Sequence, residues 1–277
     1  MFRRNRPNRI NGLSLNKLLP NILTMLALCA GLTSIRFGLH GKWESAVFSI
    51  LLAGVLDGLD GRIARLLNGT SKFGAELDSL SDFVSFGVAP AMLLYFWTMQ
   101  AAGGLGWALV LLFSVCCALR LARFNTMLGQ PDLPAWAYNF FTGVPAPAAA
   151  GLVLIPMMLS FQLGADSLFA SWLLNAVMLV LVSFLMVSKI PTFSGKRSRI
   201  PNKWVLPVLL LVGVLAAFLV TDPWGTITTI TVLYGASIPF SIRSFTQLRA
   251  KAAALRTELA VDPAASPAAT NPPGENS

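Results

Sequence analysis

The residues best suited to chemistry are acidic and lie close together in the chain. Five of the 12 Asp and Glu residues fall between positions 57 and 82. Asp57 and Asp60 are three residues apart, and Asp78 and Asp82 are four apart. Either spacing places both carboxylates of a pair on one face of a helix. Residues 67–73 include Asn, Gly, Thr and Ser, which can turn the chain back. Two antiparallel helices would then bring the four carboxylates together.

Four carboxylates at close range require a counter-charge, because unpaired anions repel strongly where the effective dielectric is low. All-oxygen ligands favour hard divalent cations such as Mg²⁺ or Mn²⁺. His40 is the only histidine, which makes a zinc site a poor fit. The pattern therefore predicts a magnesium or manganese site, and two ions could share the four carboxylates.

Small residues surround the first acidic pair. Gly58, Gly61 and Ala64 leave almost no side-chain bulk on that helix, so a ligand can approach the backbone closely. Arg65 lies one turn beyond Gly61 and offers a fixed cation that suits a phosphate. Metal ligands, a small-residue face and an arginine together indicate a site for a pyrophosphate-bearing ligand.

The composition decides which kind of protein carries this cluster. The chain has 277 residues, of which 55% are hydrophobic and only 12% charged, and its mean hydropathy is +0.66. A water-soluble domain of this size could not bury so much apolar sequence. The three cysteines lie in apolar runs, which argues against a disulfide scaffold. The composition thus indicates an integral membrane protein, whose spanning segments satisfy their backbone groups as helices.

Apolar segments long enough to span a bilayer number eight. They cover approximately residues 22–39, 44–64, 77–98, 105–123, 140–161, 170–188, 204–221 and 224–242. A short amphipathic piece at residues 13–19 precedes Pro20 and could lie in the membrane interface. We therefore expect an all-α, polytopic membrane helix bundle of about eight transmembrane helices with a short N-terminal interfacial helix. This transmembrane domain would occupy residues 13–245, between a basic tail at 1–12 and a largely disordered tail at 246–277.

The distribution of basic residues predicts the orientation. The net charge is +9, from 21 Lys and Arg against 12 Asp and Glu. With eight spans, all basic residues except Arg36 and Lys42 fall on one side, which the positive-inside rule makes cytoplasmic. The net positive charge then reflects the membrane topology and does not indicate a nucleic-acid-binding site. Both termini, the acidic cluster and the basic cluster at 196–203 would face the cytoplasm, and that basic cluster would set topology or contact anionic lipid.

The acidic motif resembles the complete signature of the CDP-alcohol phosphatidyltransferases. That signature reads Asp57-x-x-Asp60-Gly61-x-x-Ala64-Arg65, eight residues, then Gly74-x-x-x-Asp78-x-x-x-Asp82. Softer motifs are similar to one branch of the family, the membrane-integral phosphatidylserine synthases. They lie at residues 20–24 (PNILT), 79–91 (SLSDFVSFGVAPA), 119–125 (LRLARFN) and 141–150 (FTGVPAPAAA). The resemblance covers most of residues 14–245.

This resemblance implies roles for the aspartates. Asp57, Asp60 and Asp78 would ligate the metals, with Asp82 close enough to contribute and also acting as the general base. The implied reaction moves the phosphatidyl group of CDP-diacylglycerol to the hydroxyl of L-serine, with CMP as the leaving group. The resemblance further implies a homodimer in a bacterial cytoplasmic membrane.

The resemblance also implies contacts with the donor lipid. Gly61, Arg65 and Ser71 would contact CDP-diacylglycerol, and the stretch from Asn21 to Thr24 would touch its cytidine end. The region 189–203 resembles the branch less clearly and receives no specific role.

The acceptor site must be inferred from charge. The serine carboxylate needs a cation inside the bundle, and Arg120 and Arg123 lie at the cytoplasmic end of the fourth predicted span. We hypothesise that at least one of them binds serine; the alternative is that both are ordinary positive-inside anchors. Within the family, glycerol phosphate, inositol phosphate or choline are alternative acceptors. A small secondary transporter is a remote alternative, which would leave Gly61, Arg65 and Gly74 unexplained.

Overall fold

The structure is a computed structural model, and it describes residues 15–67, 69–127, 140–164, 168–188, 190–193 and 205–261. Three predictions lie outside these residues: the basic tail at 1–12, the basic cluster at 196–203 and the disordered character of the last residues of the chain.

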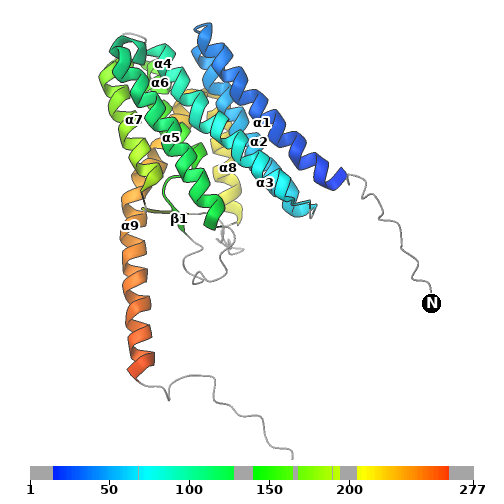
Figure 1. The fold of residues 1–277 in the computed structure, drawn as a ribbon, viewed down its shortest axis with the longest axis vertical. Helices are drawn as coiled ribbons and strands as arrows, with labels where there is room; N and C mark the ends of the chain where they lie inside the picture. Colours follow the sequence, from blue (N-terminus) through cyan, green and yellow to red (C-terminus); the bar gives the residue numbers. More distant parts are fainter. Residues whose placement is uncertain are drawn as a thin grey trace, which may run out of the picture.

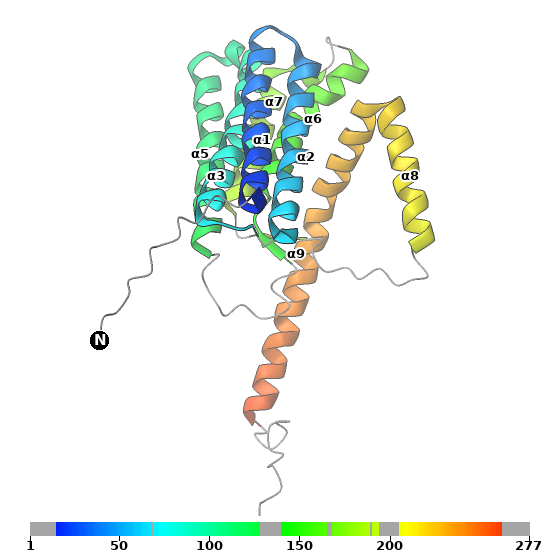
Figure 2. The same ribbon diagram turned by 90° about the vertical axis from the view of Figure 1, so that its right-hand side faces the viewer.

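Within the described residues the chain forms eight helical rods, as expected for an all-α bundle (Figures 1 and 2). The first rods are α1 (Leu15–Leu39), α2 (Trp43–Leu66) and one continuous rod made of α3 (Lys72–Asp82), the π-helix η1 (Phe83–Val88) and α4 (Ala89–Trp97). After the short 3-10 turn η2 (Met99–Ala102) come α5 (Gly103–Met127), α6 (Ala146–Leu163) and α7 (Trp172–Val187). The last two are α8 (Val205–Thr221) and α9 (Pro223–Val261).

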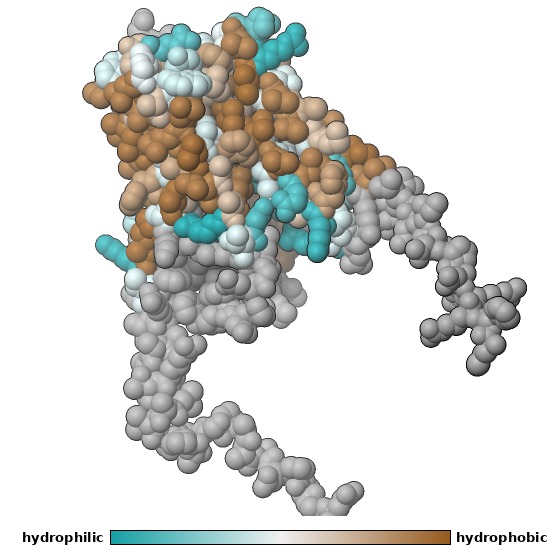
Figure 3. Space-filling model, viewed as in Figure 1, coloured by the Kyte–Doolittle hydropathy of each residue, from teal (hydrophilic) through white to brown (hydrophobic). Residues whose placement is uncertain are grey.

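Several of these helices can cross a bilayer. Five are long and apolar enough, at Leu18–Leu39, Lys72–Trp97, Met99–Thr126, Ala146–Leu163 and Pro223–Ser244. The apolar helices α7 and α8 are shorter, with 16 and 17 residues. Figure 3 shows hydrophobic side chains covering the middle of the bundle on the face drawn. The chain is an integral membrane protein with several candidate spans.

The starts of α1 and α6 differ from the sequence prediction. The short helix expected at 13–19 is not a separate element in the described residues, because α1 runs without interruption from Leu15 through Pro20. The fifth span begins at Ala146 and not at residue 140, because Gly143 has a left-handed φ of 79° and Pro145 is extended. The preceding residues form β1 (Phe140–Thr142), which pairs antiparallel with β2 (Pro191–Phe193).

The C-terminal helices contribute less to the core. None of the α8 residues that the structure describes is buried, and Figure 2 shows α8 splayed away from the other helices beside α9. Helix α9 continues to Val261 and passes the end of the bundle, so the helix extends beyond the boundary expected at residue 245.

Helix α1 packs tightly against the rod that carries Asp78 and Asp82. A Cβ atom added to Gly31 on α1 would lie 2.8 Å from the Cα of Ser85, so glycine permits the two backbones to approach. The Ser85 hydroxyl donates to the Ala27 carbonyl at 3.3 Å. Such bonds between helices are favourable in lipid, where water does not compete for the polar groups. The contact fixes how η1, and with it the rod that carries Asp78 and Asp82, lies relative to α1.

Candidate active site

The structure brings the acidic residues together where α2 ends and α3 begins. Asp57 and Asp60 on α2 and Asp78 on α3 each offer a carboxylate oxygen, and these oxygens lie within 4.8 Å of one another. The Asp57 carboxyl also lies at hydrogen-bonding distance from that of Asp82. The predicted helical hairpin thus gathers four carboxylates, because the spacings of three and four residues keep each pair on one helix face.

The donor set fits a divalent metal ion. Asp60 is only 4% exposed, so its charge is poorly hydrated beside those of Asp57 and Asp78. Mutual repulsion among carboxylates at this distance requires a nearby positive charge. The oxygens are the hard ligands that Mg²⁺ and Mn²⁺ accept. The cluster could therefore bind a metal ion, as the sequence predicts.

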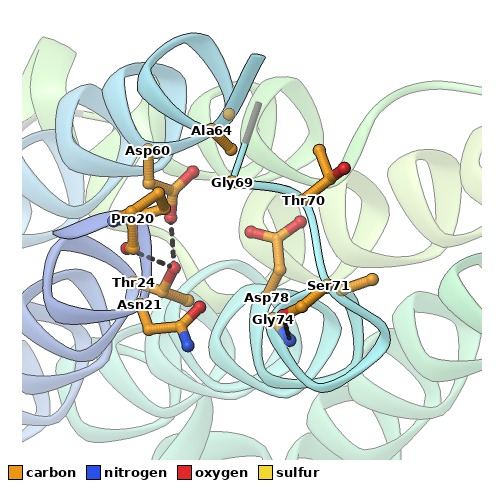
Figure 4. Close-up of a pocket in the computed structure, with 12 residues that line it drawn as sticks. Pro20, Asn21, Thr24, Asp60, Ala64, Gly69, Thr70, Ser71, Gly74 and Asp78 are labelled. Atoms are coloured by element: carbon orange, nitrogen blue, oxygen red, sulfur yellow. Dashed lines mark hydrogen bonds between the residues drawn. The ribbon is translucent and has the colours of Figure 1, made fainter. Parts of the chain in front are cut away.

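A pocket opens beside the cluster between α1, the end of α2 and the start of α3 (Figure 4). Its volume is about 190 Å³. In Figure 4 Asp60 and Asp78 lie on facing sides of the pocket, one contributed by each helix. The lining consists of small and polar residues with two of the aspartates: Pro20, Asn21, Thr24, Asp60, Gly61, Ala64, Gly69, Thr70, Ser71, Gly74, Ala75 and Asp78.

The structure places four of the five predicted donor-lipid contacts in this lining: Asn21, Thr24, Gly61 and Ser71. The fifth, Arg65, is exposed on the last turn of α2 and is not part of the lining. Apart from its own helix, no heavy atom of the described residues lies within 4 Å of a Cβ added to Gly61. The pocket therefore has open space above the α2 backbone at this position.

Two lining residues also have partners within the protein. The Thr24 hydroxyl lies 2.6 Å from Asp60 Oδ2, although the two residues are 36 positions apart in sequence. Ser71 caps α3 by accepting a hydrogen bond of 3.0 Å from the Gly74 amide. The sequence pattern misses the Thr24–Asp60 contact because it depends on how α1 packs against α2. The Ser71 cap is a local signal that the sequence does carry.

The two candidate acceptor arginines have different surroundings. Arg120 is 9% exposed and lies close enough to Asp82 for an electrostatic interaction. Among the described residues, its Nε has no hydrogen-bond partner. Arg123 donates from Nη1 to the Val187 carbonyl at 2.8 Å and from Nη2 to the Ser188 carbonyl at 3.2 Å. It thereby caps the C-terminus of α7, where backbone carbonyls lack helical partners.

Sequence reasoning missed two further features around Asp82. Asn125 on α5 donates to the Ser79 hydroxyl at 2.9 Å, which ties α5 to the helix that carries the second acidic pair. The π-helix η1 begins directly after Asp82. Short π-helical turns inside longer helices frequently occur at functional sites. Of these, only the polar character of Ser79 and Asn125 is visible in the sequence.

Comparison with known proteins agrees with the geometry. Residues 17–187 match the family described as CDP-alcohol phosphatidyltransferase, and residues 203–239 match CDP-alcohol phosphatidyltransferase 2. A protein of Mycobacterium leprae is 41% identical over 228 residues, which cover 82% of this chain and 75% of that protein. A protein of Mycobacterium tuberculosis is 39% identical over 239 residues, which cover 86% of this chain and 82% of that protein. A protein of Helicobacter pylori is 36% identical over 226 residues, which cover 78% of this chain and 87% of that protein.

All three relatives are described as CDP-diacylglycerol–serine O-phosphatidyltransferases. The matched region includes every aspartate of the cluster and the whole lining of the pocket. The extent and identity of these matches show that the chain belongs to the CDP-alcohol phosphatidyltransferase family.

Proposed function

We propose that the chain transfers the phosphatidyl group of CDP-diacylglycerol to the hydroxyl of L-serine, giving phosphatidylserine and CMP. The observation that carries this proposal is the group of Asp57, Asp60 and Asp78, whose oxygens lie within 4.8 Å beside an open pocket. Relatives at about 40% identity over most of the chain carry the name of the same activity. We propose serine, and not another acceptor of the family, because the names of these relatives specify serine.

The pocket would receive the cytidine diphosphate end of the donor. The pyrophosphate can approach the α2 backbone at Gly61, where the space is open. Asn21 and Ser71 both line this pocket and can hydrogen-bond the nucleotide. Arg65, exposed at the end of α2, would reach a phosphate from outside the lining. The acyl chains would remain in lipid along the apolar helices.

Asp57, Asp60 and Asp78 would hold Mg²⁺ or Mn²⁺, with Asp82 near enough to contribute, and we propose two ions. When bound, these ions supply positive charge that neutralises the phosphates and the developing charge on the leaving CMP. The protein residues contribute rigidity, since each aspartate projects from a helix. Rigid placement means that little reorganisation is required when charge develops.

The chemistry is a displacement at the phosphorus attached to diacylglycerol. The serine oxygen forms a new bond to that phosphorus, the bond from phosphorus to the CMP oxygen breaks, and Asp82 takes the hydroxyl proton. A carboxylate is needed because the serine hydroxyl is a weak nucleophile at neutral pH. Asp82 is half-buried beside Asp57 and close to Arg120.

Arg120 is the residue we propose for the serine carboxylate. Its guanidinium is buried, and among the residues that the structure describes its Nε has no hydrogen-bond partner, so a bound carboxylate would satisfy it. Its position near Asp82 would place the serine hydroxyl beside the proposed base. Arg123 already donates to two carbonyls at the end of α7. We therefore propose for it only an indirect role at the acceptor site, which is to hold α7 against α5.

The orientation follows from the substrates. The start of α3, which lines the pocket, lies toward the same end of the bundle as the end of α5 and the ends of α1 and α9 nearest the termini (Figure 1). Serine and the CDP group are water-soluble, so this end would face the cytoplasm of a bacterial cell, as the basic residues also indicate. A homodimer is proposed from the family resemblance.

The test measures CMP release from CDP-diacylglycerol by the purified protein with serine, glycerol 3-phosphate, inositol phosphate or choline. We expect serine alone to support release, chelation to abolish it and Mg²⁺ or Mn²⁺ to restore it. Asp57→Ala, Asp60→Ala and Asp78→Ala should each lose orders of magnitude in rate. Glu76→Gln, an exposed residue on the same hairpin, is the matched control. Full activity in chelator would refute the metal site, and release with another acceptor would refute serine.

A further inference from the structure

Thr24 occupies a buried position between the two halves of the carboxylate cluster. It lies on α1 and is 4% exposed. Its hydroxyl lies 2.6 Å from Asp60 Oδ2 and 3.1 Å from the Pro20 carbonyl (Figure 4). A hydroxyl has one proton to donate. The shorter contact has the length of a charge-assisted bond from a hydroxyl to a carboxylate, so the proton belongs with Asp60.

The backbone of the same residue contacts the other helix. The Ser81 hydroxyl donates to the Thr24 carbonyl at 3.2 Å, and Ser81 is 3% exposed. Ser81 directly precedes Asp82 in α3. One turn further along, Ser85 donates to the Ala27 carbonyl, so the two serine contacts hold α3 against α1 in one register. Thr24 therefore contacts α2 through its side chain and α3 through its backbone.

We propose that Thr24 is a positioning residue that acts through Asp60, fixing the Asp60 carboxylate and the spacing between the acidic pairs of α2 and α3. The proposal rests on the metal-dependent function proposed above. It differs from a direct contact with the nucleotide, because the donor proton of the hydroxyl is committed to Asp60. Groups that orient a metal ligand in this way typically change metal affinity when removed.

The first experiment measures Mn²⁺ binding to the purified protein by electron paramagnetic resonance, without lipid substrate or serine. Thr24→Val keeps the branched shape and removes the hydroxyl. We expect it to weaken Mn²⁺ binding by about 10- to 100-fold. Thr24→Ser restores the hydroxyl and should bind nearly as well as the wild type. Thr33→Val is the matched control, since Thr33 lies on the same helix and its hydroxyl donates locally, to the Cys29 carbonyl.

Kinetics separate positioning from nucleotide binding. We expect Thr24→Val to regain activity as the Mn²⁺ concentration is raised, with the KM for CDP-diacylglycerol at saturating metal unchanged. Wild-type Mn²⁺ affinity together with a raised donor KM would overturn the proposal and make Thr24 a nucleotide contact. Absence of Mn²⁺ binding by the wild type itself would instead refute the metal site on which the proposed function depends.

A second variant keeps the proposal testable if Thr24→Val does not fold. Ser81→Ala removes the bond to the Thr24 carbonyl and leaves the Thr24 hydroxyl in place. We expect it to weaken Mn²⁺ binding less than Thr24→Val does, by about 2- to 10-fold for the loss of one neutral hydrogen bond. Unchanged Mn²⁺ affinity in Ser81→Ala would overturn the inference that α1 sets the spacing between the acidic pairs.

Discussion

Replacing Gly61 by alanine should raise the stability of the protein and at the same time lower its activity with CDP-diacylglycerol. Gly61 lies inside α2, and its added Cβ would meet no heavy atom of the described residues within 4 Å outside its own helix. Alanine is favoured over glycine in a helix by about 0.8–1.0 kcal/mol. With no steric cost in the free protein, we expect the free energy of unfolding to rise by about that amount.

The same methyl group would occupy the space into which we place the donor pyrophosphate. Forcing an extra methylene into a packed contact typically costs about 1–3 kcal/mol. At about 1.4 kcal/mol per factor of ten, this predicts a fall of about 5- to 150-fold in kcat/KM for CDP-diacylglycerol. The serine dependence should change little, because the proposed acceptor residue Arg120 lies on α5.

The assay pairs thermal unfolding in detergent with steady-state kinetics for each substrate. Gly58→Ala is the matched control, since a Cβ added there also meets no heavy atom of the described part of the chain within 4 Å outside its own helix, and Gly58 does not line the pocket. It should gain stability without losing donor affinity. A Gly61→Ala enzyme with unchanged kcat/KM for the donor would show that the pocket beside Gly61 does not hold CDP-diacylglycerol.

Three further outcomes follow from the structure. Asp82→Asn keeps the side-chain shape but removes the base, so kcat should fall by about 10²- to 10⁴-fold with donor binding mostly retained. If the variant instead binds CDP-diacylglycerol poorly but keeps its kcat at saturating donor, Asp82 is a binding ligand and not the base. Arg120→Lys replaces a planar fork with a point charge and should raise the KM for serine about tenfold, but not that for CDP-diacylglycerol, as measured by varying each substrate. Gly31→Ala would bring a Cβ within 2.8 Å of the Ser85 Cα and should lower the unfolding temperature, whereas Gly213→Ala on the open face of α8 should not. Equal unfolding temperatures would contradict the close contact between α1 and η1.

The convergence of the aspartates is predictable because it depends on local information. Spacings of three and four residues determine a helix face, and the short segment between Leu66 and Lys72 reverses the chain, so that α3 starts at the end of the bundle where α2 ends. The apolar runs likewise predict the eight helical segments. These features need only the sequence near each residue.

Contacts between distant helices could not be predicted in this way. The Thr24–Asp60 bond and the capping of α7 by Arg123 join residues 36 and 64 positions apart. Both depend on the rotation of each helix about its axis, which a hydropathy pattern defines only to within a broad face. The π-helix η1 is invisible for a related reason, since a wider turn at residues 83–88 leaves the apolar character of the segment unchanged.

The placement of Thr24 and the four aspartates before residue 83 has a consequence for synthesis in the cell. The helices α1, α2 and α3 are synthesised before α5, and the N-terminal part of a chain generally folds first during synthesis. At about 5–20 residues per second, the ribosome needs roughly 2–8 s to pass from Asp82 to Arg120. The carboxylate hairpin therefore belongs to the earliest part of the nascent chain to reach the bilayer. The arginine we propose for serine lies on α5 and is synthesised later, so the residues proposed for the metal leave the ribosome before the residue proposed for the acceptor.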